Sequence, residues 1–192
     1  MDLRGKTGAG VMACKHALVE CDGDLEQAID LLRKQGEQIA LKRQGRTTTQ
    51  GLCYSYVHAG EQIGVLVEVN CESDFVARNE DFRHFAKDVA MQIAAMRPRW
   101  ITREEVPADL LAREREVLTE QAKAEGKPEH IAEKMVEGRI GKFFQEFCLL
   151  DQPFIRDDSV TVGQLLTALI AKTGENVQIG RFCRYQVGEE EA

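Results

Sequence analysis

Apolar and polar residues alternate along residues 63–70, and this pattern is the clearest structural signal in the chain. Isoleucine and valine occupy every second position, at Ile63, Val65, Val67 and Val69. A period of two predicts a strand with one face on a core. The polar run Asn70–Asp74 follows, and its residue types have poor strand propensity. We therefore expect the strand to end there and to present Asp74 and Phe75 at the tip of a sheet.

Two further stretches have the pattern of strands. Residues 52–57 precede a turn at 58–61 that contains Gly60, and residues 63–70 return from that turn as the second half of a hairpin. Residues 177–187 alternate in the same way near the end of the chain. The sequence therefore predicts a three-stranded sheet whose third strand is distant in sequence from the other two.

Apolar residues in the first 36 positions recur at the spacing of helices. Asp24 is placed to cap a helix with the apolar face Leu25, Ala28, Ile29 and Leu32, and Gly36 is expected to end that helix. A preceding helix is indicated by Val11, Cys14, Ala17 and Leu18. Residues 37–51 are rich in polar residues and have the composition of a linker.

An amphipathic helix is predicted after Asn79, which is placed as its cap. Its apolar stripe must cover the sheet and consists of Phe82, Phe85, Ala86, Val89, Ile93 and Met96. The pair Arg97-Pro98 is expected to end it.

Residues 104–148 have the pattern of two helices joined by a short turn. Thr102–Glu105 resembles a capping box, Pro107 suits a first turn, and Gly126–Pro128 breaks the pattern. So short a connection requires antiparallel helices. The expected apolar seam consists of Leu110, Leu111, Val117, Leu118, Ala122, Ile131, Met135, Ile140, Phe143 and Phe147.

The predicted fold class is α+β, with three parts in the chain. Residues 1–36 form a small helical module, residues 37–51 a linker, and residues 52–192 a core. The core holds the three-stranded sheet, the helices that cover it, and the projecting antiparallel helical hairpin at 104–148. A helix that Thr161 caps is expected before the last strand.

Composition narrows the possible functions. The net charge of −7 and the pI near 5.2 argue against a protein that binds nucleic acid directly. No apolar run approaches the roughly 18 residues that span a bilayer, and no signal peptide is recognisable, so we expect a cytoplasmic protein without membrane contact. The six cysteines and four histidines lack metal-site spacing, so no metal or cofactor is expected.

The stretch Ser73–Phe75 allows three interpretations. Ser73 or Asp74 could cap a helical turn while Phe75 packs in the core. Alternatively, the turn presents Phe75 to a partner. Thiol chemistry at Cys71 beside Asp74 is a third interpretation, but the local sequence supplies no general base. Because no other catalytic set is recognisable, we do not expect an enzyme.

The wider sequence resembles a known family. Residues 70–79, Asn-Cys-Glu-Ser-Asp-Phe-Val-Ala-Arg-Asn, resemble the Asn-Cys-x-Thr-Asp-Phe-Val-Ala signature of the elongation factor Ts family, the guanine-nucleotide exchange factors of bacterial and organellar translation. Thr7–Gly10 with Cys14-Lys15, residues 131–139 and Gln152–Phe154 resemble other motifs of this family. The resemblance covers nearly the whole chain.

The resemblance implies a function and a set of site residues. It implies that the partner is elongation factor Tu with GDP bound, and that the chain promotes GDP release by displacing magnesium. In the elongation factor Ts family, magnesium dislocation is assigned to four residues, and the resemblance matches them to Ser73, Asp74, Phe75 and Val76. Partner docking would involve Arg4, Val11 and Met12, with His58 in the hairpin turn as a further candidate contact. Residues 1–36 would be a ubiquitin-associated-like module, and residues 104–148 a coiled-coil hairpin.

Two questions stay open from the sequence. The alternative function is a non-catalytic adaptor that binds a client through the ubiquitin-associated-like module and would not need the Ser-Asp-Phe segment. The oligomeric state is the other question. A lone three-stranded sheet leaves unpaired edges and a partly uncovered apolar face, which predicts a homodimer.

Overall fold

The structure is a computed structural model that describes residues 2–125 and 128–189, and its secondary structure is α+β, as predicted. The chain divides into two units. The first comprises residues 1–94 and 164–192, and the second comprises residues 95–163. Within the described residues, no helix combines the length and apolar character needed to cross a membrane.

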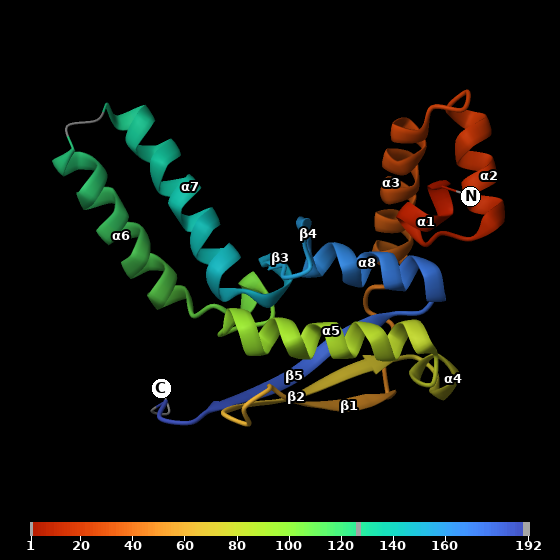
Figure 1. The fold of residues 1–192 in the computed structure, drawn as a ribbon. Coiled ribbons are helices and arrows are strands. Elements are labelled where there is room, and N and C mark those ends of the chain that lie inside the picture. Colours follow the sequence, from red (N-terminus) through yellow and green to blue (C-terminus); the bar gives the residue numbers. More distant parts are fainter. Residues whose placement is uncertain (1, 126–127, 190–192) are drawn as a thin grey trace. The chain divides into compact units, whose positions relative to one another are not determined.

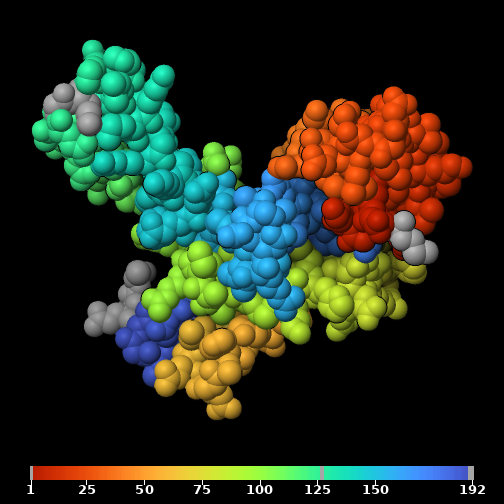
Figure 2. Space-filling view, turned by 45° about the horizontal axis from the view of Figure 1, so that its top comes forward, coloured from red at the N-terminus to blue at the C-terminus, as the bar shows by residue number. Residues whose placement is uncertain are grey.

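Three helices at the start of the first unit form one lobe, red to orange in Figure 2. They are α1 (Asp2–Thr7), α2 (Val11–Glu20) and α3 (Leu25–Arg43). Their buried core consists of Leu3, Cys14, Ala17, Ala28 and Leu32. The cap at Asp24 is confirmed, because its carboxylate Oδ1 accepts a hydrogen bond from the backbone N–H of Gln27 at 3.0 Å.

The predicted helix end at Gly36 was wrong. Helix α3 continues to Arg43, so residues 37–43 of the expected linker are helical. Gly36 is buried, and a Cβ atom placed on it would lie 3.4 Å from the Cβ of Ala171 in α8 (Val162–Thr173). A glycine inside a helix costs about 1 kcal/mol relative to alanine. Close packing between α3 and α8 gives a reason for glycine at this position that local sequence does not show.

The predicted three-stranded sheet is confirmed. It consists of β1 (Gln50–Val57), β2 (Ile63–Cys71) and β5 (Val177–Gln186), in the antiparallel order β1-β2-β5. Val65, Val67 and Val69 of the central strand are buried, as the alternation predicts. A bulge interrupts the pairing of β2 with β5 between Glu68 and Val69.

Helix α5 (Glu80–Met96) covers one face of this sheet (Figure 1). Asn79 caps it as expected, since its side-chain Oδ1 accepts from the backbone N–H of Asp81 at 2.8 Å. The predicted stripe is buried from Phe82 to Ile93. Met96 is a correction, because it lies in the last turn of the helix and is 41% exposed.

The opposite face of the sheet carries exposed apolar side chains. In the described part of the chain, Val57, Leu66 and Tyr185 are exposed on this face, and Val187 is exposed just beyond the end of β5. Leu66 pairs with Cys183, and Gly64 pairs with Tyr185, so these residues lie on neighbouring strands. The first unit therefore has a sheet with one covered and one uncovered face.

The second unit contains the helices α6 (Ala108–Ala124) and α7 (Glu129–Phe147). Helix α6 ends at Ala124 and α7 begins at Glu129, and the two helices lie side by side and antiparallel (Figure 1). Between them, Arg115 is paired with Glu137, and Arg139 donates to Gln121 at 2.8 Å. Leu118, Val136 and Ile140 form their buried seam. The expected break at Gly126–Pro128 falls partly outside the described residues, which resume at Pro128, directly before α7.

Two details of the hairpin prediction were wrong. Val117 and Ile131 were placed in the apolar seam but are 47% and 40% exposed, because they lie beside the stripe that the buried residues define. The capping box is also absent, since Thr102 makes no side-chain cap to the short 3-10 helix η1 (Arg103–Glu105). Glu105 instead accepts a hydrogen bond from the backbone N–H of Ile101 at 2.8 Å.

The remainder of the second unit is held by a buried glutamine. Gln152 follows the 3-10 helix η2 (Leu149–Asp151), is fully buried, and donates from its amide to the carbonyl of Glu146 at 2.8 Å. A small sheet of β3 (Pro153–Phe154) and β4 (Asp157–Thr161) follows it. Strands this short carry little periodicity, so the sequence alone does not predict their pairing.

Candidate functional site

The signature residues after β2 form one short helical turn, α4 (Asp74–Ala77). Ser73 caps this turn, since its Oγ accepts a hydrogen bond from the backbone N–H of Val76 at 3.3 Å. Figure 1 shows α4 at the end of β2, directly before α5. We call residues 73–76 the tip segment. The prediction that Ser73 or Asp74 caps a helical turn is therefore confirmed for Ser73.

Phe75 does not pack in the core. Its side chain is 81% exposed, which is unusual for a phenylalanine in a protein of this size. Val76, the next residue, is only 6% exposed and faces inward. Val76 therefore packs against the rest of the unit, and Phe75 is presented to solvent. The interpretation in which Phe75 packs in the core was wrong. An exposed aromatic side chain on an ordered turn is typical of a protein-binding contact.

Asp74 lies beside Phe75 on the same exposed surface. Its carboxylate pairs with the guanidinium of Arg78 one turn later, and both side chains are more than half exposed. A solvent-exposed ion pair contributes little to stability. The Asp74 carboxylate can therefore exchange Arg78 for a polar group of a partner at low cost.

Cys71 is unsuited to nucleophilic chemistry. It is fully buried at the end of β2, and its Sγ donates to the backbone carbonyl of Ser73 at 3.1 Å. Burial, with a smaller contribution from the negative charge of Glu175, raises the pKa of this thiol to about 11. Since the thiolate is the reactive form, almost none is present near neutral pH. The geometry does not support the thiol hypothesis.

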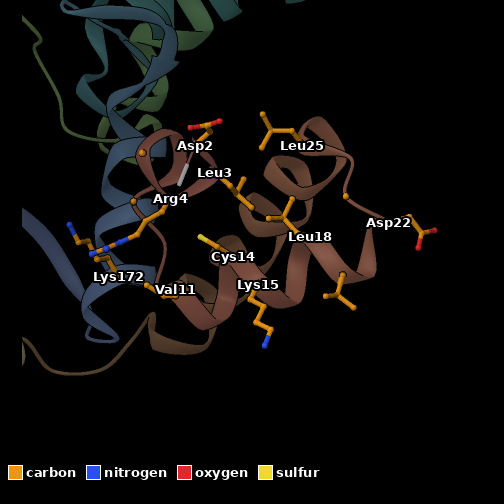
Figure 3. Close-up of a pocket in the computed structure, with 14 residues that line it drawn as sticks. Asp2, Leu3, Arg4, Val11, Cys14, Lys15, Leu18, Asp22, Leu25 and Lys172 are labelled. Carbon is orange, nitrogen blue, oxygen red and sulfur yellow. The ribbon is translucent and has the colours of Figure 1, made fainter.

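The three N-terminal candidate residues are all exposed. Arg4 lies on α1, and Val11 and Met12 begin α2 with 63% and 60% of their surface accessible. Arg4 and Val11 also line an open depression that includes Lys172 of α8. Figure 3 shows Leu3, Cys14 and Leu18 at the centre of this depression, with Arg4 and Lys172 toward one side. Met12 is not among its lining residues.

His58 is exposed but lies apart from the tip segment. It follows β1 in the turn, and its Nδ1 is 2.9 Å from the hydroxyl of Tyr56. The register pairs Val57 with Gly64 at this end and Gln50 with Cys71 at the other. Seven steps along a strand span about 24 Å. The structure therefore brings Ser73, Asp74, Phe75 and Val76 together and leaves His58 at the opposite end of the hairpin.

The residue that holds the tip segment in place could not be predicted from the sequence. Glu175 accepts two hydrogen bonds from Ser73, although 102 positions separate them. No local pattern in the sequence could have shown this contact, because it depends on the pairing of β2 with β5. In the part of the chain that the structure describes, no group of three or more metal-ligating side chains could hold a metal ion.

Comparisons of the chain with a family model and with single proteins find the same family. The model of the family described as "Elongation factor TS" matches residues 10–189. The chain is 57% identical to elongation factor Ts of Desulforamulus reducens, over 98% of this chain and 87% of that protein. It is 58% identical to elongation factor Ts of Solidesulfovibrio magneticus, over 98% and 94% of the two chains. For elongation factor Ts of Fervidobacterium nodosum the identity is 53%, over 98% and 95%.

These matches include the tip segment and extend well beyond it, over both structural units. The resemblance that the motifs indicated is therefore confirmed over almost the whole length of the chain. The chain belongs to the elongation factor Ts family.

Proposed function

We propose that this chain promotes GDP release from elongation factor Tu through its exposed tip segment, which displaces the magnesium ion of the GTPase. The broader role follows from the family, which makes the chain a nucleotide exchange factor of translation elongation. The adaptor alternative is not favoured, because the matching relatives carry the name of an elongation factor over their whole matched length. The proposal requires no contact with nucleic acid or a membrane and a location in the cytoplasm.

The observation that carries the proposal is the exposure of Phe75 on a capped turn. A phenylalanine that is 81% exposed contributes little burial to its own fold, so its apolar surface is available to a partner. Aromatic side chains that fill a partner's pocket dominate many interfaces. We propose that Phe75 enters an apolar pocket of the GTPase domain while Asp74 binds polar groups beside it.

Exchange of this kind is a coupling of two binding equilibria. A factor that binds the empty GTPase more tightly than the GDP form must weaken GDP binding by the same factor. Magnesium neutralises and bridges the phosphates of a bound nucleotide, so moving the groups that hold the ion lowers nucleotide affinity. The chain itself makes or breaks no covalent bond in this account, which is why we do not class it as an enzyme.

The N-terminal lobe supplies the second contact in this proposal. Residues 1–36 act as a ubiquitin-associated-like docking module, with Arg4, Val11 and Met12 on the surface that binds the GTPase. Two adjacent apolar side chains at the exposed start of α2 support this assignment. The core at 52–192, with the coiled-coil hairpin at 104–148, carries the tip segment, and His58 adds only a peripheral contact.

We also propose a homodimer formed through the uncovered face of the sheet. Val57, Leu66 and Tyr185 are 63%, 44% and 65% exposed there, and β1 is an edge strand. Proteins usually cover apolar surface of this kind. Sedimentation equilibrium at micromolar concentration is expected to give twice the monomer mass of 21.6 kDa. A single species at the monomer mass contradicts the dimer.

The function itself is tested by stopped-flow measurement of fluorescent GDP leaving elongation factor Tu. We expect the chain to accelerate release in a concentration-dependent and saturable way. Release at the spontaneous rate over the whole concentration range contradicts the proposed function.

A further inference from the structure

Two carboxylates join the end of β2 to the start of β5. Glu175 accepts a hydrogen bond from the hydroxyl of Ser73 at 2.6 Å and another from the backbone N–H of Ser73 at 3.0 Å. In the reciprocal direction, Glu72 accepts from the backbone N–H of Asn176 at 2.6 Å. We call these four residues, Glu72, Ser73, Glu175 and Asn176, the cross-strand clamp. Hydrogen bonds to a carboxylate are stronger than those between neutral groups.

The clamp is itself supported from a third segment. Asn176 is 3% exposed and donates from its amide to the backbone carbonyl of Arg46 at 2.8 Å. The Arg46 guanidinium lies 3.4 Å from the Glu72 carboxylate. The hydrogen bond from Asn176 is the main reason that the pKa of Glu72 lies below its usual value. Residues before β1, after β2 and before β5 therefore meet at one end of the sheet.

Backbone geometry places Glu175 at this position. Helix α8 ends at Thr173, and Gly174 follows with φ +71°, a conformation that favours glycine. The next two residues belong to the clamp, and β5 begins at Val177, which pairs with Cys71 of β2. The turn after α8 thus directs Glu175 toward Ser73, just beyond the last residue pair of β2 and β5.

The tip segment needs such support. Helix α4 has four residues, and a helical turn of this length has no stability of its own. Phe75 adds little burial, so the turn is fixed by the buried Val76 on one side and by the hydrogen bonds of Ser73 on the other. Ser73 uses its Oγ twice, as acceptor for the N–H of Val76 and as donor to Glu175.

We propose that Glu175 is a positioning residue for nucleotide exchange, which orients the Ser73 cap and through it the exposed Phe75. This inference rests on the proposed function, because the effect on exchange requires that Phe75 contacts the GTPase. Glu175 acts through Ser73 and does not itself touch nucleotide or magnesium. Its loss leaves the docking surface of the N-terminal lobe intact but lets the tip segment adopt other orientations.

The test compares three variants in the GDP-release assay. Glu175→Ala removes both acceptor oxygens, and Glu175→Gln retains one. Glu105→Ala is the matched control, because it also removes a carboxylate that accepts from a backbone N–H, at Ile101 in the other unit. We expect Glu175→Ala to lower the maximal rate about tenfold while the half-saturating concentration changes less than about twofold. Glu175→Gln should recover part of the rate, and Glu105→Ala should match the unchanged chain.

A double-variant cycle separates positioning from a general loss of stability. If Glu175 acts through Phe75, adding Glu175→Ala to Phe75→Ala lowers the maximal rate by less than about a further twofold. Losses that multiply across the two positions overturn the proposal. A loss in Glu105→Ala equal to that in Glu175→Ala overturns it as well. If Glu175→Ala fails to fold by circular dichroism, Glu175→Gln replaces it in the cycle.

Hydrogen exchange of the free chain tests the clamp independently of the GTPase. The amide of Ser73 loses its acceptor in Glu175→Ala, so its exchange should quicken about tenfold or more while the rest of the sheet is unchanged. Unchanged exchange at residues 72–77 refutes the positioning role even if the chain stimulates GDP release. If the unchanged chain does not stimulate release, the proposed function fails, and faster exchange of Ser73 alone would still support the clamp.

Discussion

The two ends of the β1–β2 hairpin are both exposed, yet they are built differently. At one end, the turn with His58 is closed by backbone hydrogen bonds, from His58 to Ile63 and from Glu61 to His58, at 2.9 Å each. At the other end, Ser73 is held by a carboxylate from a distant segment and caps the turn that carries Phe75. Only the second end presents a large apolar side chain on a turn fixed by side-chain hydrogen bonds.

This difference indicates which exposed residues carry function. An exposed polar residue in a hairpin turn has a sufficient explanation in the turn itself, because such turns favour polar residues. An exposed phenylalanine has no such explanation. Holding its side chain in one orientation lowers the entropy cost of binding a partner. The difference therefore supports the proposal that the tip segment makes the central partner contact and His58 a peripheral one.

The largest effect is expected from Phe75→Ala. We expect stimulated GDP release to fall by about 2 kcal/mol, or about thirtyfold, because an interface hot spot is lost. The melting temperature should stay unchanged, since the side chain is 81% exposed. Stopped-flow release and differential scanning calorimetry measure the two quantities. Early melting with proportionate loss of exchange would return Phe75 to a structural role.

A smaller effect of a different kind is expected at the N-terminal lobe. Changing Val11 and Met12 together to serine should raise the half-saturating concentration about tenfold and leave the maximal rate nearly unchanged, because docking and displacement use different contacts. Leu41→Ser is the matched control, since Leu41 is 68% exposed on α3 of the same lobe and outside the docking set. A reduced maximal rate with an unaltered half-saturating concentration would remove the distinction between the two contacts.

At the opposite end of the hairpin, His58→Ala should change stimulated release by less than about twofold, as for a residue at the rim of an interface. Its hydrogen bond to Tyr56 is solvent-exposed, so stability should change little. The same release assay measures this variant beside Phe75→Ala. A loss comparable to that of Phe75→Ala would show that both ends of the hairpin bind the partner centrally.

No effect on exchange is expected from thiol reagents. The raised pKa and complete burial of Cys71 should protect it from iodoacetamide at pH 8. The exposed Cys53 and Cys183 lie on the uncovered face of the sheet, so they should react in the monomer. Mass spectrometry of the alkylated chain identifies the modified residues. Modification of Cys71 in the folded chain with parallel loss of exchange would revive the thiol hypothesis.

The strands and the α5 helix could be predicted because their patterns are local. The period of two at Ile63, Val65, Val67 and Val69 and the cap at Asn79 depend only on neighbouring residues. Gly36 was misinterpreted because its reason is a contact with Ala171 of another helix. Local propensity favours a helix end at glycine, and tertiary packing overrode it here.

The site divides in the same way. The cap at Ser73 follows from residue type and spacing, whereas the exposure of Phe75 required the structure, because an isolated phenylalanine is expected in a core. Glu175 could not be found at all from the sequence. Its role depends on the register of β2 with β5, which brings positions 102 residues apart into contact.

One measurement tests the central claim, that the tip segment acts by displacing magnesium. The maximal rate of GDP release from elongation factor Tu is compared between the unchanged chain and Phe75→Ala, first with magnesium and then with the ion removed by EDTA. The account predicts a ratio of about thirty with magnesium and a ratio approaching one without it, because no ion is left to displace. An equally large ratio in both conditions would contradict the magnesium mechanism.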